Sequence, residues 1–411
     1  MAIKGKNISD LKAIPSKFVK SEEASTIFSS LLCIVIGLAI GLCILLMIKP
    51  ASGITGFYDI LTGAFILPSS TAIALTNTAP LILVGLSVTF AFKCGLFNIG
   101  VAGQYLMGII GCLIPALMWG LPWYLCILCG AALGALWGVI PGLLKTYCNV
   151  NEVISSIMTN WIALFLVNDI VKNTSMYDGS SFTTSYVEGW GVIPTWFGLD
   201  STGTSIVTYG LLIAFVIAIL THVFLTKTKY GYELRACGLN KDAAKYVGIN
   251  HKKNIVVAMA GAGMFAGIAA SVYFLSNSGT YNPNVSSMLP QMGFDGISVA
   301  LIGGLNPVGG IFSALLLAFL TRGSTTINQN VFPVEMASLI FGVIIYLCAF
   351  NSFFKTKIHK FLNRKNNETL LVSSCNENKE NVVVETKNSS TVDVEEVVED
   401  NEILAKKDGD E

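Results

Sequence analysis

The sequence predicts an all-α protein that crosses a membrane many times. Of its 411 residues, 53% are hydrophobic and only 13% are charged, against the roughly 25% charged residues of soluble domains. The apolar residues form runs such as 28–48 and 205–225, about as long as the roughly 20 residues that span a hydrocarbon core. Because lipid offers backbone groups no partners, spanning segments are helices or barrel strands, and continuous apolar runs lack the alternation of barrel strands.

Ten apolar runs follow a polar amino-terminal segment of residues 1–27. We expect each run to be a spanning helix of one transmembrane domain, residues 28–354. The third, eighth and ninth runs are too short to cross a bilayer as straight helices. The first is long enough to stay as an anchor instead of being removed as a signal. In order, the runs are 28–48, 71–92, 104–119, 122–141, 152–171, 205–225, 254–276, 293–305, 308–321 and 333–351.

Basic residues predict the side that each loop faces, because cytoplasmic loops retain Lys and Arg near the spans. The first 27 residues hold five lysines, so we expect the amino terminus inside. Ten spans then place Lys93, Lys145 and the loop 226–253, which has seven basic residues, on the cytoplasmic side. The loop 172–204, with one lysine and three acidic residues, falls outside. These expectations describe a multi-pass protein of a bacterial cytoplasmic membrane with both termini inside.

The carboxy-terminal tail, residues 355–411, is predicted to be charged, cytoplasmic and disordered. From residue 366 on it holds 4 basic and 13 acidic residues, a composition that cannot bury enough apolar surface to fold alone. A solvated tail without a specific role is the simpler interpretation, and a regulatory role is the alternative. The basic groups of the remaining chain follow the topology, so we expect no nucleic-acid partner.

The sequence predicts no metal, cofactor or enzyme active site. Six of the ten cysteines lie inside apolar runs, where a thiol behaves as a small hydrophobe. Cys126 and Cys129 have C-x-x-C spacing but lack a second ligand pair. The three histidines, His222, His251 and His359, lie near cytoplasmic ends without a cluster of nucleophiles or ligands.

A first glycine-rich interruption covers residues 95–104 and carries the amides of Asn98 and Gln104. Glycine permits irregular backbone, and such backbone is tolerated at membrane depth where protein buries it or a solute cavity lines it. The two amides are therefore candidates for a solute pathway. The alternative is that the glycines allow close helix packing and the amides bond neighbouring helices.

A second interruption covers residues 293–310 and contains Asp295. Paired broken segments in two halves are expected of transporters built from repeats. By the predicted topology the two halves start on opposite sides, so any repeat would be inverted. An ionisable group in an apolar span suggests function, although Asp295 could instead lie at the interface, satisfied by nearby N–H groups.

The loop 226–254 is predicted to contain a short helix capped by Asn240 or Asp242. Glycine is favoured just past a helix end, so the helix should end near Gly248. It would present Ala243, Ala244, Tyr246 and Val247. The alternative is an interfacial helix that lies on the membrane.

Four segments, in order, resemble the permeases of branched-chain-type and sugar-type ABC transporters. Phe97-Asn-Ile-Gly-Val-Ala-Gly-Gln104 looks like the most specific motif of that family, and together the segments cover 71–350. Residues 151–160, starting Asn-Glu-Val-Ile, and the Gly-Phe-Asp-Gly run at 293 are most similar to the nucleoside and purine branch. The other matching segment is 78–92.

This resemblance implies a dimeric channel that receives solute from an extracytoplasmic binding protein or lipoprotein. It also implies a cytoplasmic ATPase docked on short coupling helices, with a related permease or a second copy as the other half. The acidic-Ala-Ala-x-x-x-Gly pattern of coupling loops matches Asp242, Ala243, Ala244 and Gly248, and Asp replaces the commoner Glu. Glu233 lies in the same loop, and we expect a helix over 233–248 to transmit the movement of the ATPase to the spans. The implied function is ATP-driven nucleoside import, with ribose or another simple sugar as the alternative.

No G-x-x-x-x-G-K-[ST] occurs in the chain, so ATP hydrolysis is expected in another subunit. For a nucleoside, amides would bond sugar and base and aromatic rings would stack on the base. The candidates are Phe97, Asn98, Gln104, Asn160 and Asp295. An ion-coupled transporter is the alternative of another class, with Asp295, Glu152 and Asp169 as its titratable groups.

Overall fold

The computed structural model describes residues 22–199, 205–276, 279–283 and 288–325, with 332, 339–340, 342–344 and 346–347. All of them belong to one compact unit, Met1–Ser352. The predicted tail, residues 355–411, lies outside the described residues.

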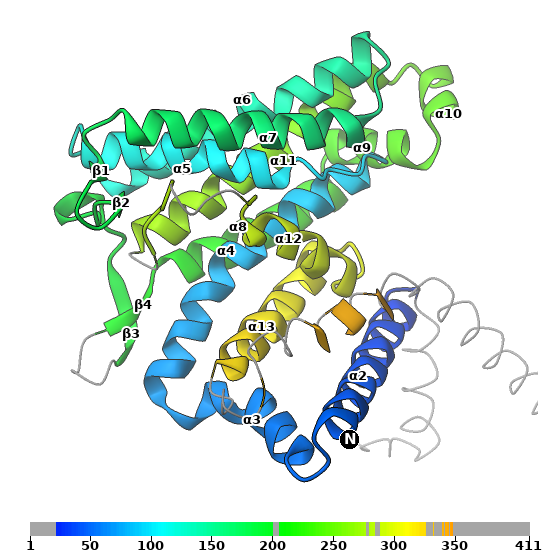
Figure 1. The fold of residues 1–411 in the computed structure, drawn as a ribbon. Coiled ribbons are helices and arrows are strands. Elements are labelled where there is room, and N and C mark those ends of the chain that lie inside the picture. Colours follow the sequence, from blue (N-terminus) through cyan, green and yellow to red (C-terminus); the bar gives the residue numbers. More distant parts are fainter. Residues whose placement is uncertain are drawn as a thin grey trace, which may run out of the picture. The chain divides into compact units, whose positions relative to one another are not determined.

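The described chain is almost entirely helical, which confirms the all-α prediction (Figure 1). Short strands occur only between α7 and α8 in the part of the chain that is described. The helices are α2 (Glu22–Ile48), α3 (Gly53–Ile66), α4 (Pro68–Lys93), α5 (Val101–Leu117), α6 (Trp123–Tyr147), α7 (Glu152–Lys172), α8 (Gly210–Lys227), α9 (Lys229–Leu239), α10 (Lys241–Tyr246), α11 (His251–Leu275), α12 (Gln291–Ile302) and α13 (Pro307–Ser324).

Among the described helices, seven are long and apolar enough to cross a membrane: α2, α4, α6, α7, α8, α11 and α13. The protein is therefore a multi-pass membrane protein. Helices α5 and α12 are shorter, as predicted for the third and eighth runs. The ninth run was predicted to be too short, but α13 extends to Ser324. The tenth run lies mostly outside the described residues, and its described parts, 339–340, 342–344 and 346–347, are helical.

Two helix starts differ from the prediction by five or six residues. Helix α2 begins at Glu22, inside the segment expected to be a polar terminus. Helix α8 begins at Gly210, because the residues before it pair as a strand. In both cases hydropathy marks the apolar part of a segment and not where its backbone changes conformation.

Helix α3 was not predicted. Its glycines and Ile60 are buried, while Ile54, Tyr58 and Phe65 are more than 60% exposed. A Cβ on Gly323 of α13 would lie 2.0 Å from the Ile60 carbonyl oxygen, so the two backbones are in close contact. A 14-residue helix is too short to span a bilayer. With its apolar outer face, α3 fits a position near the membrane surface, beside the end of α13.

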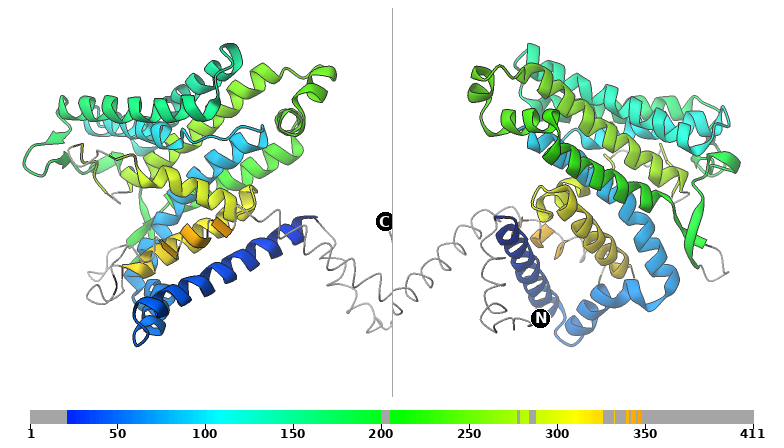
Figure 2. Two further views of the ribbon diagram at one scale, coloured as in Figure 1. Left: turned by 45° about the vertical axis from the view of Figure 1, so that its right-hand side comes forward. Right: turned by 180° about the vertical axis from the view of Figure 1, so that it is seen from behind.

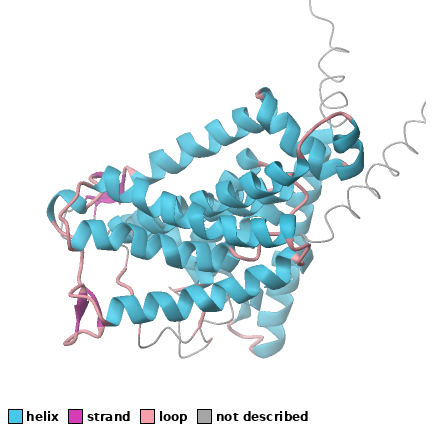
Figure 3. Ribbon diagram, turned by 90° about the horizontal axis from the view of Figure 1, so that it is seen from above, coloured by secondary structure: helices cyan, strands magenta, loops and turns pink. Residues whose placement is uncertain are grey.

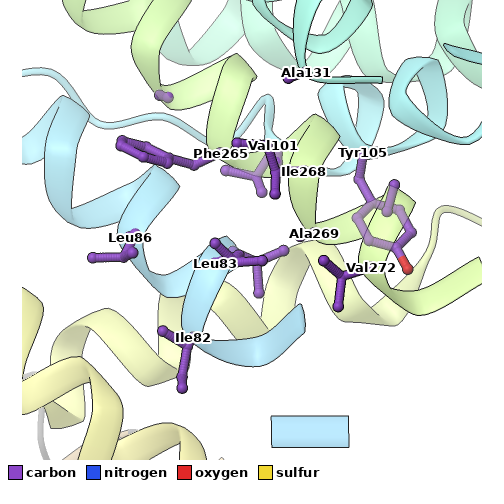
Figure 4. Close-up of a cluster of buried hydrophobic side chains, with 14 of the residues drawn as sticks. Ile82, Leu83, Leu86, Val101, Tyr105, Ala131, Phe265, Ile268, Ala269 and Val272 are labelled. Carbon is purple, nitrogen blue, oxygen red and sulfur yellow. The ribbon is translucent and has the colours of Figure 1, made fainter. Parts of the chain in front are cut away.

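The centre of the protein is formed by α4, α5 and α11. Every residue of α5 from Val101 to Leu113 is buried, and Figure 3 shows long helices of the bundle lying side by side. Leu83, Leu86, Tyr105 and Phe265 meet in one apolar cluster between these helices (Figure 4). In lipid such packing supplies dispersion contacts instead of a hydrophobic driving force.

Helices α6 and α11 approach backbone to backbone through glycines. A Cβ on Gly263 would lie 2.2 Å from the Gly134 carbonyl oxygen, and one on Gly267 would lie 2.1 Å from that of Gly130. Real Cβ atoms do not approach so closely, so only glycine fits. This contact fixes the two helices mainly through their backbones, with the Ser271 hydroxyl beside Gly130.

The loop predicted to lie outside contains two hairpins and a short 3-10 turn. Strands β1 (Tyr177–Asp178) and β2 (Thr183–Thr184) pair antiparallel, as do β3 (Thr195–Leu199) and β4 (Ser205–Thr208). Hydrogen bonds from the hydroxyl and backbone N–H of Ser180 and from Ser181 hold the pKa of exposed Asp178 at about 2.

This loop is bonded to the segment after α11. Thr184 N donates to the Tyr281 carbonyl at 2.8 Å, and Tyr281 N donates to Thr184 Oγ1 at 3.1 Å. Tyr281 Oη donates to Asn168 Oδ1 at 2.6 Å. Ile193 N also donates to the Leu275 carbonyl at 2.9 Å. The first and second halves of the chain are thus joined here.

Helices α9 and α10, whose loop 226–253 holds seven of the basic residues predicted to be cytoplasmic, lie at the opposite end of the bundle from the hairpins (Figure 1 and Figure 2). Lys145 forms an ion pair with Glu152 at 2.7 Å, and the Lys252 ammonium lies 5.9 Å from the Tyr147 ring centre. The backbone of Lys93 contacts Gly238 in α9. The basic loop 226–253 and the more acidic loop 172–204 therefore lie at opposite ends of one helical bundle.

Candidate functional site

The first glycine-rich segment is irregular between α4 and α5. Helix α4 ends at Lys93, residues 94–100 form a turn and an extended stretch, and α5 begins at Val101. Gly95 has φ of +74°, a left-handed conformation that L side chains adopt at a cost. The chain therefore reverses direction at Gly95, where any residue with a side chain would be strained.

Asn98 and Gln104 bond to each other inside this segment. Asn98 Nδ2 donates to Gln104 Oε1 at 2.9 Å, and Gly100 N donates to Asn98 Oδ1 at 3.0 Å. The exposed fractions are 0% for Asn98 and 1% for Gln104. Asn98 thus satisfies part of the backbone that the missing helical turn leaves unpaired.

Asn160 ties the same segment to α7. Gly103 N donates to Asn160 Oδ1 at 2.8 Å, and Asn160 Nδ2 donates to the Ile99 carbonyl at 3.0 Å. A Cβ on Gly103 would lie 2.7 Å from Asn160 Oδ1, so glycine is needed for this approach. We call Asn98, Gln104 and Asn160 the amide cluster.

The amide cluster uses its hydrogen bonds within the chain. This geometry favours the packing role that the sequence left open for these residues. Contact with a solute stays a prediction, because the three side chains are buried against protein. Sequence reasoning missed Ser156, whose buried hydroxyl lies beside Gly100 and has no hydrogen-bond partner among the residues that the structure describes. A serine one helical turn before Asn160 was the available signal.

The second glycine-rich segment contains α12, a turn and the start of α13. Gly304 and Leu305 have φ of +65° and +55°, and the Asn306 side chain accepts from Val308 N at 3.1 Å to cap α13. A Cβ on Gly309 would lie 2.2 Å from the Gly303 carbonyl oxygen. This segment is therefore a second helix break stabilised by close backbone contact.

The two broken segments touch. A Cβ on Gly293 in α12 would lie 2.6 Å from Cα of Ala102 in α5. Helix α4 lies beside both, since a Cβ on Gly296 would lie 2.9 Å from the Val84 backbone. The segments that the sequence paired by composition are thus neighbours in space, although 191 residue numbers separate Ala102 from Gly293.

Phe97 and Asp295 are the less buried pathway candidates. The Phe97 ring lies edge-on to Phe92, with centroids 6.4 Å apart. Asp295 accepts a hydrogen bond from Gln291 Nε2 at 3.2 Å, one turn earlier in α12. Among the residues that the structure describes, neither side chain is bonded to the amide cluster, so the five candidates form one group of three and two separate positions.

The predicted short helix is present as α10. Asn240 Oδ1 accepts from Asp242 N and Ala243 N, both at 3.0 Å, and α10 ends at Tyr246. Gly248, at φ of +85°, follows the helix. We call residues 240–248 the knob. Its most exposed apolar side chains, Tyr246 and Val247, are 93% and 80% exposed.

Two expectations for the knob were wrong. Ala244 was predicted to be presented at the surface, but it is 4% exposed and packs inward, whereas Asp242 and Ala243 are exposed. The helix predicted over 233–248 is not continuous. The chain forms α9 and α10 instead, because Asn240 adopts an extended conformation that caps the second helix. Glu233 lies half-buried in α9.

Groups that would suit other chemistries are dispersed. Among the residues that the structure describes, no three His, Cys, Asp or Glu side chains come together as a metal site. Glu152 is paired with Lys145, and Asp169 accepts a hydrogen bond from Asn173. Two of the three titratable groups named for an ion-coupled transporter thus have local partners at helix ends.

Comparison with known proteins places residues 70–349 in a family described as the permease component of branched-chain amino acid transport systems. The guanosine ABC transporter permease protein NupP of Bacillus subtilis is 34% identical, over 78% of this chain and 92% of its own length. The nucleoside ABC transporter permease protein NupB of Lactococcus lactis is 32% identical, over 78% and 89%.

A second guanosine permease of Bacillus subtilis also matches. This protein, NupQ, is 27% identical over 60% of this chain and 78% of its own length. Two different permeases of one organism, both named for guanosine, are thus similar to the same chain. No solved structure matches.

Proposed function

This chain belongs to the family of branched-chain-amino-acid-type transport permeases, and from that premise we propose that it is the membrane-spanning subunit of an ATP-driven nucleoside importer. The observation that carries the proposal is its similarity, over most of both chains, to permeases named for nucleosides and guanosine. A ribose or other simple-sugar importer is the alternative within the same class.

The protein is a transport component and not an enzyme. Its relatives are permeases, and the chain has no G-x-x-x-x-G-K-[ST] loop to cradle ATP phosphates. ATP hydrolysis belongs to a separate ATPase subunit. Movement of that subunit would shift the permease between outward-open and inward-open states, as a ligand shifts populations between two conformations.

The ATPase is proposed to dock on the knob. Asp242, Ala243 and Gly248 are exposed there, and Tyr246 and Val247 offer apolar side chains that a partner would cover. Exposed large apolar groups on a capped, rigid helix suit an anchor in a protein interface. Ala244 supports the knob from inside, and Glu233 lies on the preceding helix α9.

The second half of the channel is proposed to be a related permease. The similarity of this chain to both NupP and NupQ supports a mixed pair over two copies of one chain. An extracytoplasmic binding protein or lipoprotein would deliver the solute at the end that carries the β1–β2 and β3–β4 hairpins. The basic end with α9 and α10 would face the cytoplasm, in a bacterial cytoplasmic membrane.

We propose that the solute path passes beside the contact between Gly293 and Ala102. Asp295 follows Gly293 by two residues and Phe97 precedes Ala102 by five, and both side chains are only partly buried. They are therefore the first candidates for solute binding. The amide cluster would form the wall, and its members would reach the solute only when their internal hydrogen bonds exchange. In this proposal residues 28–354 form the permease domain and 226–253 its coupling loop.

Uptake in cells with and without the gene tests the function. Labelled guanosine, inosine and ribose are measured in untreated cells, after ATP depletion, and with an uncoupler while ATP is held constant. Nucleoside uptake that needs the gene and follows ATP supports the proposal. Loss of ribose uptake alone would reassign the solute, and uptake that collapses with the uncoupler at constant ATP would favour an ion-coupled transporter.

A further inference from the structure

The last turn of α9 presses against the point where α4 breaks. A Cβ on Gly238 would lie 2.3 Å from the Lys93 carbonyl oxygen and 2.9 Å from Gly95 N. From the other side, a Cβ on Gly95 would lie 3.2 Å from Gly238 Cα. The two segments therefore meet backbone to backbone, and glycine is present on both sides of the contact.

A third helix joins this contact through two buried thiols. Asn254 Nδ2, near the start of α11, donates to Cys237 Sγ at 3.5 Å. Cys94 Sγ donates to the Asn254 carbonyl at 3.7 Å. Cys94 and Cys237 are 0% and 2% exposed. The ends of α4, α9 and α11 are thus held together at one place.

The contact lies between the knob and the amide cluster. On one side, Asn240 N donates to the Ala236 carbonyl at 3.2 Å, so the knob continues directly from the last turn of α9. On the other side, three residues separate Gly95 from Ile99, whose carbonyl is bonded to Asn160. Continuous packing and hydrogen bonding therefore connect the knob to α5 and α7.

We propose that the Gly238–Gly95 contact is the joint through which movement of the knob reaches the first broken segment. This inference rests on the proposed function, because it assumes that an ATPase moves the knob. A backbone contact has no side-chain rotamers to absorb a displacement, and packed interiors transmit strain. Gly238 and Gly95 are then positioning residues that couple ATP hydrolysis to transport.

Gly238→Ala is the most selective test. Gly238 is helical, and alanine is the better helix former, so a defect would not come from loss of α9 itself. The new methyl group would push α9 away from Lys93 and Gly95. A matched control is Gly134→Ala in α6, where a Cβ would lie 2.4 Å from the Gly263 carbonyl oxygen, an equally severe clash that is remote from the joint.

The readout is guanosine imported per ATP hydrolysed, in liposomes that contain the complex with its co-expressed ATPase and second permease. Changes along a coupling route alter coupling by about two- to thirtyfold, so Gly238→Ala should lower this ratio within that range while ATP hydrolysis continues. Gly134→Ala should lower the amount of folded protein and leave the ratio unchanged. A normal ratio in Gly238→Ala would overturn the inference.

Thiol labelling gives a second readout that needs no transport. Alkylation of Cys94 and Cys237 is followed by mass spectrometry in the wild-type complex with and without ATP, with exposed Cys148 as the internal reference. Labelling of the buried pair should change with ATP in the wild-type complex, and in Gly238→Ala it should be high and independent of ATP. If the labelling of Cys94 and Cys237 in the wild-type complex does not change with ATP, the proposed role of the joint is contradicted.

The two proposals fail in different ways. A wild-type complex that hydrolyses ATP but imports no guanosine would contradict the proposed solute, and the labelling of Cys94 and Cys237 would still decide the joint. If the wild-type complex imports guanosine and the Gly238→Ala variant is fully coupled, the inference about the joint is wrong and the proposed function stands.

Discussion

The α6–α11 contact and the junction between residues 94–104 and α7 are both built on glycines, but they are held differently. At the first, Gly134 and Gly130 meet Gly263 and Gly267 backbone to backbone. At the second, Gly103 meets both the side chain and the backbone of Asn160, and hydrogen bonds of the amide cluster also hold the parts together.

The difference separates a fixed region from one with a second arrangement available to it. Dispersion contacts between backbones are lost together as soon as the helices part. Hydrogen bonds of amides, in contrast, can be exchanged for others, since each amide has two donors and an acceptor oxygen. We therefore expect α6 and α11 to move as one body and the amide junction to be the place that rearranges.

The largest expected effect comes from Gly267→Leu on the fixed side. Overpacking costs about 1–3 kcal/mol where neighbours can yield, but the neighbour here is the Gly130 backbone. We expect no folded protein to be recovered, as measured by size-exclusion chromatography in detergent. Gly179→Leu, in open space in the β1–β2 turn, is the control. Recovery of monodisperse Gly267→Leu protein would show that α6 and α11 are free to separate.

Asn160→Ala should have the next largest effect. It leaves Gly103 N and the Ile99 carbonyl without partners, at about 1–3 kcal/mol for each buried group. Thermal unfolding in detergent should shift down, and Asn160→Asp, which keeps the acceptor for Gly103 N, should recover part of the loss. Exposed Asn173→Ala should stay within about 0.5 kcal/mol of wild type. An unchanged melting temperature in Asn160→Ala would mean that the amides do not hold the junction.

Asn240→Ala should have a smaller and more local effect. Loss of a helix cap costs about 0.5–2 kcal/mol, so hydrogen exchange in residues 241–247 should become faster and less ATPase should copurify. Asn306→Ala removes the corresponding cap of α13 and should leave ATPase binding unchanged. Equal ATPase recovery with both variants would show that the knob does not need its helical form.

The smallest expected effect is at Asp178, where hydrogen bonds are exposed to water instead of buried. Its pKa of about 2 lies below the ordinary 3.8 because Ser180 and Ser181 bond the carboxylate. The stabilisation is therefore present above about pH 4 and is lost as the pH falls toward 2. In Ser180→Ala the β1–β2 turn should become protease-sensitive at a higher pH than in wild type. Identical acid profiles would show that these bonds contribute nothing to the turn.

Much of the fold could be predicted from the sequence, because lipid permits few alternatives. Apolar length located nine helices, and the lysines and arginines anticipated which loops share an end. Helix α3 was missed because its 14 residues are shorter than a span, and its packing depends on Gly323, far along the chain. The hairpins of the outer loop were missed because short strands next to a membrane carry no hydropathy signal.

The site was harder to predict than the fold. Glycine and amide content located both broken segments, and Asn240 and Gly248 located the knob. The partners of each side chain depend on residues distant in sequence, as with Asn160 and Ile99 or Cys237 and Asn254. Sequence alone could not tell whether an amide in a glycine-rich stretch faces a solute or a neighbouring backbone. The burial of Ala244 likewise depends on tertiary packing.

Tyr281 has a consequence for how the two halves of the chain move. It is buried and bonded through its backbone to Thr184 and through its hydroxyl to Asn168, while the knob lies at the other end. A body clasped at one end and pushed at the other turns about the clasp. The displacement is then smallest beside the hairpins and grows with distance from them. We therefore expect α7 and α11 to separate most at the ends nearest the knob.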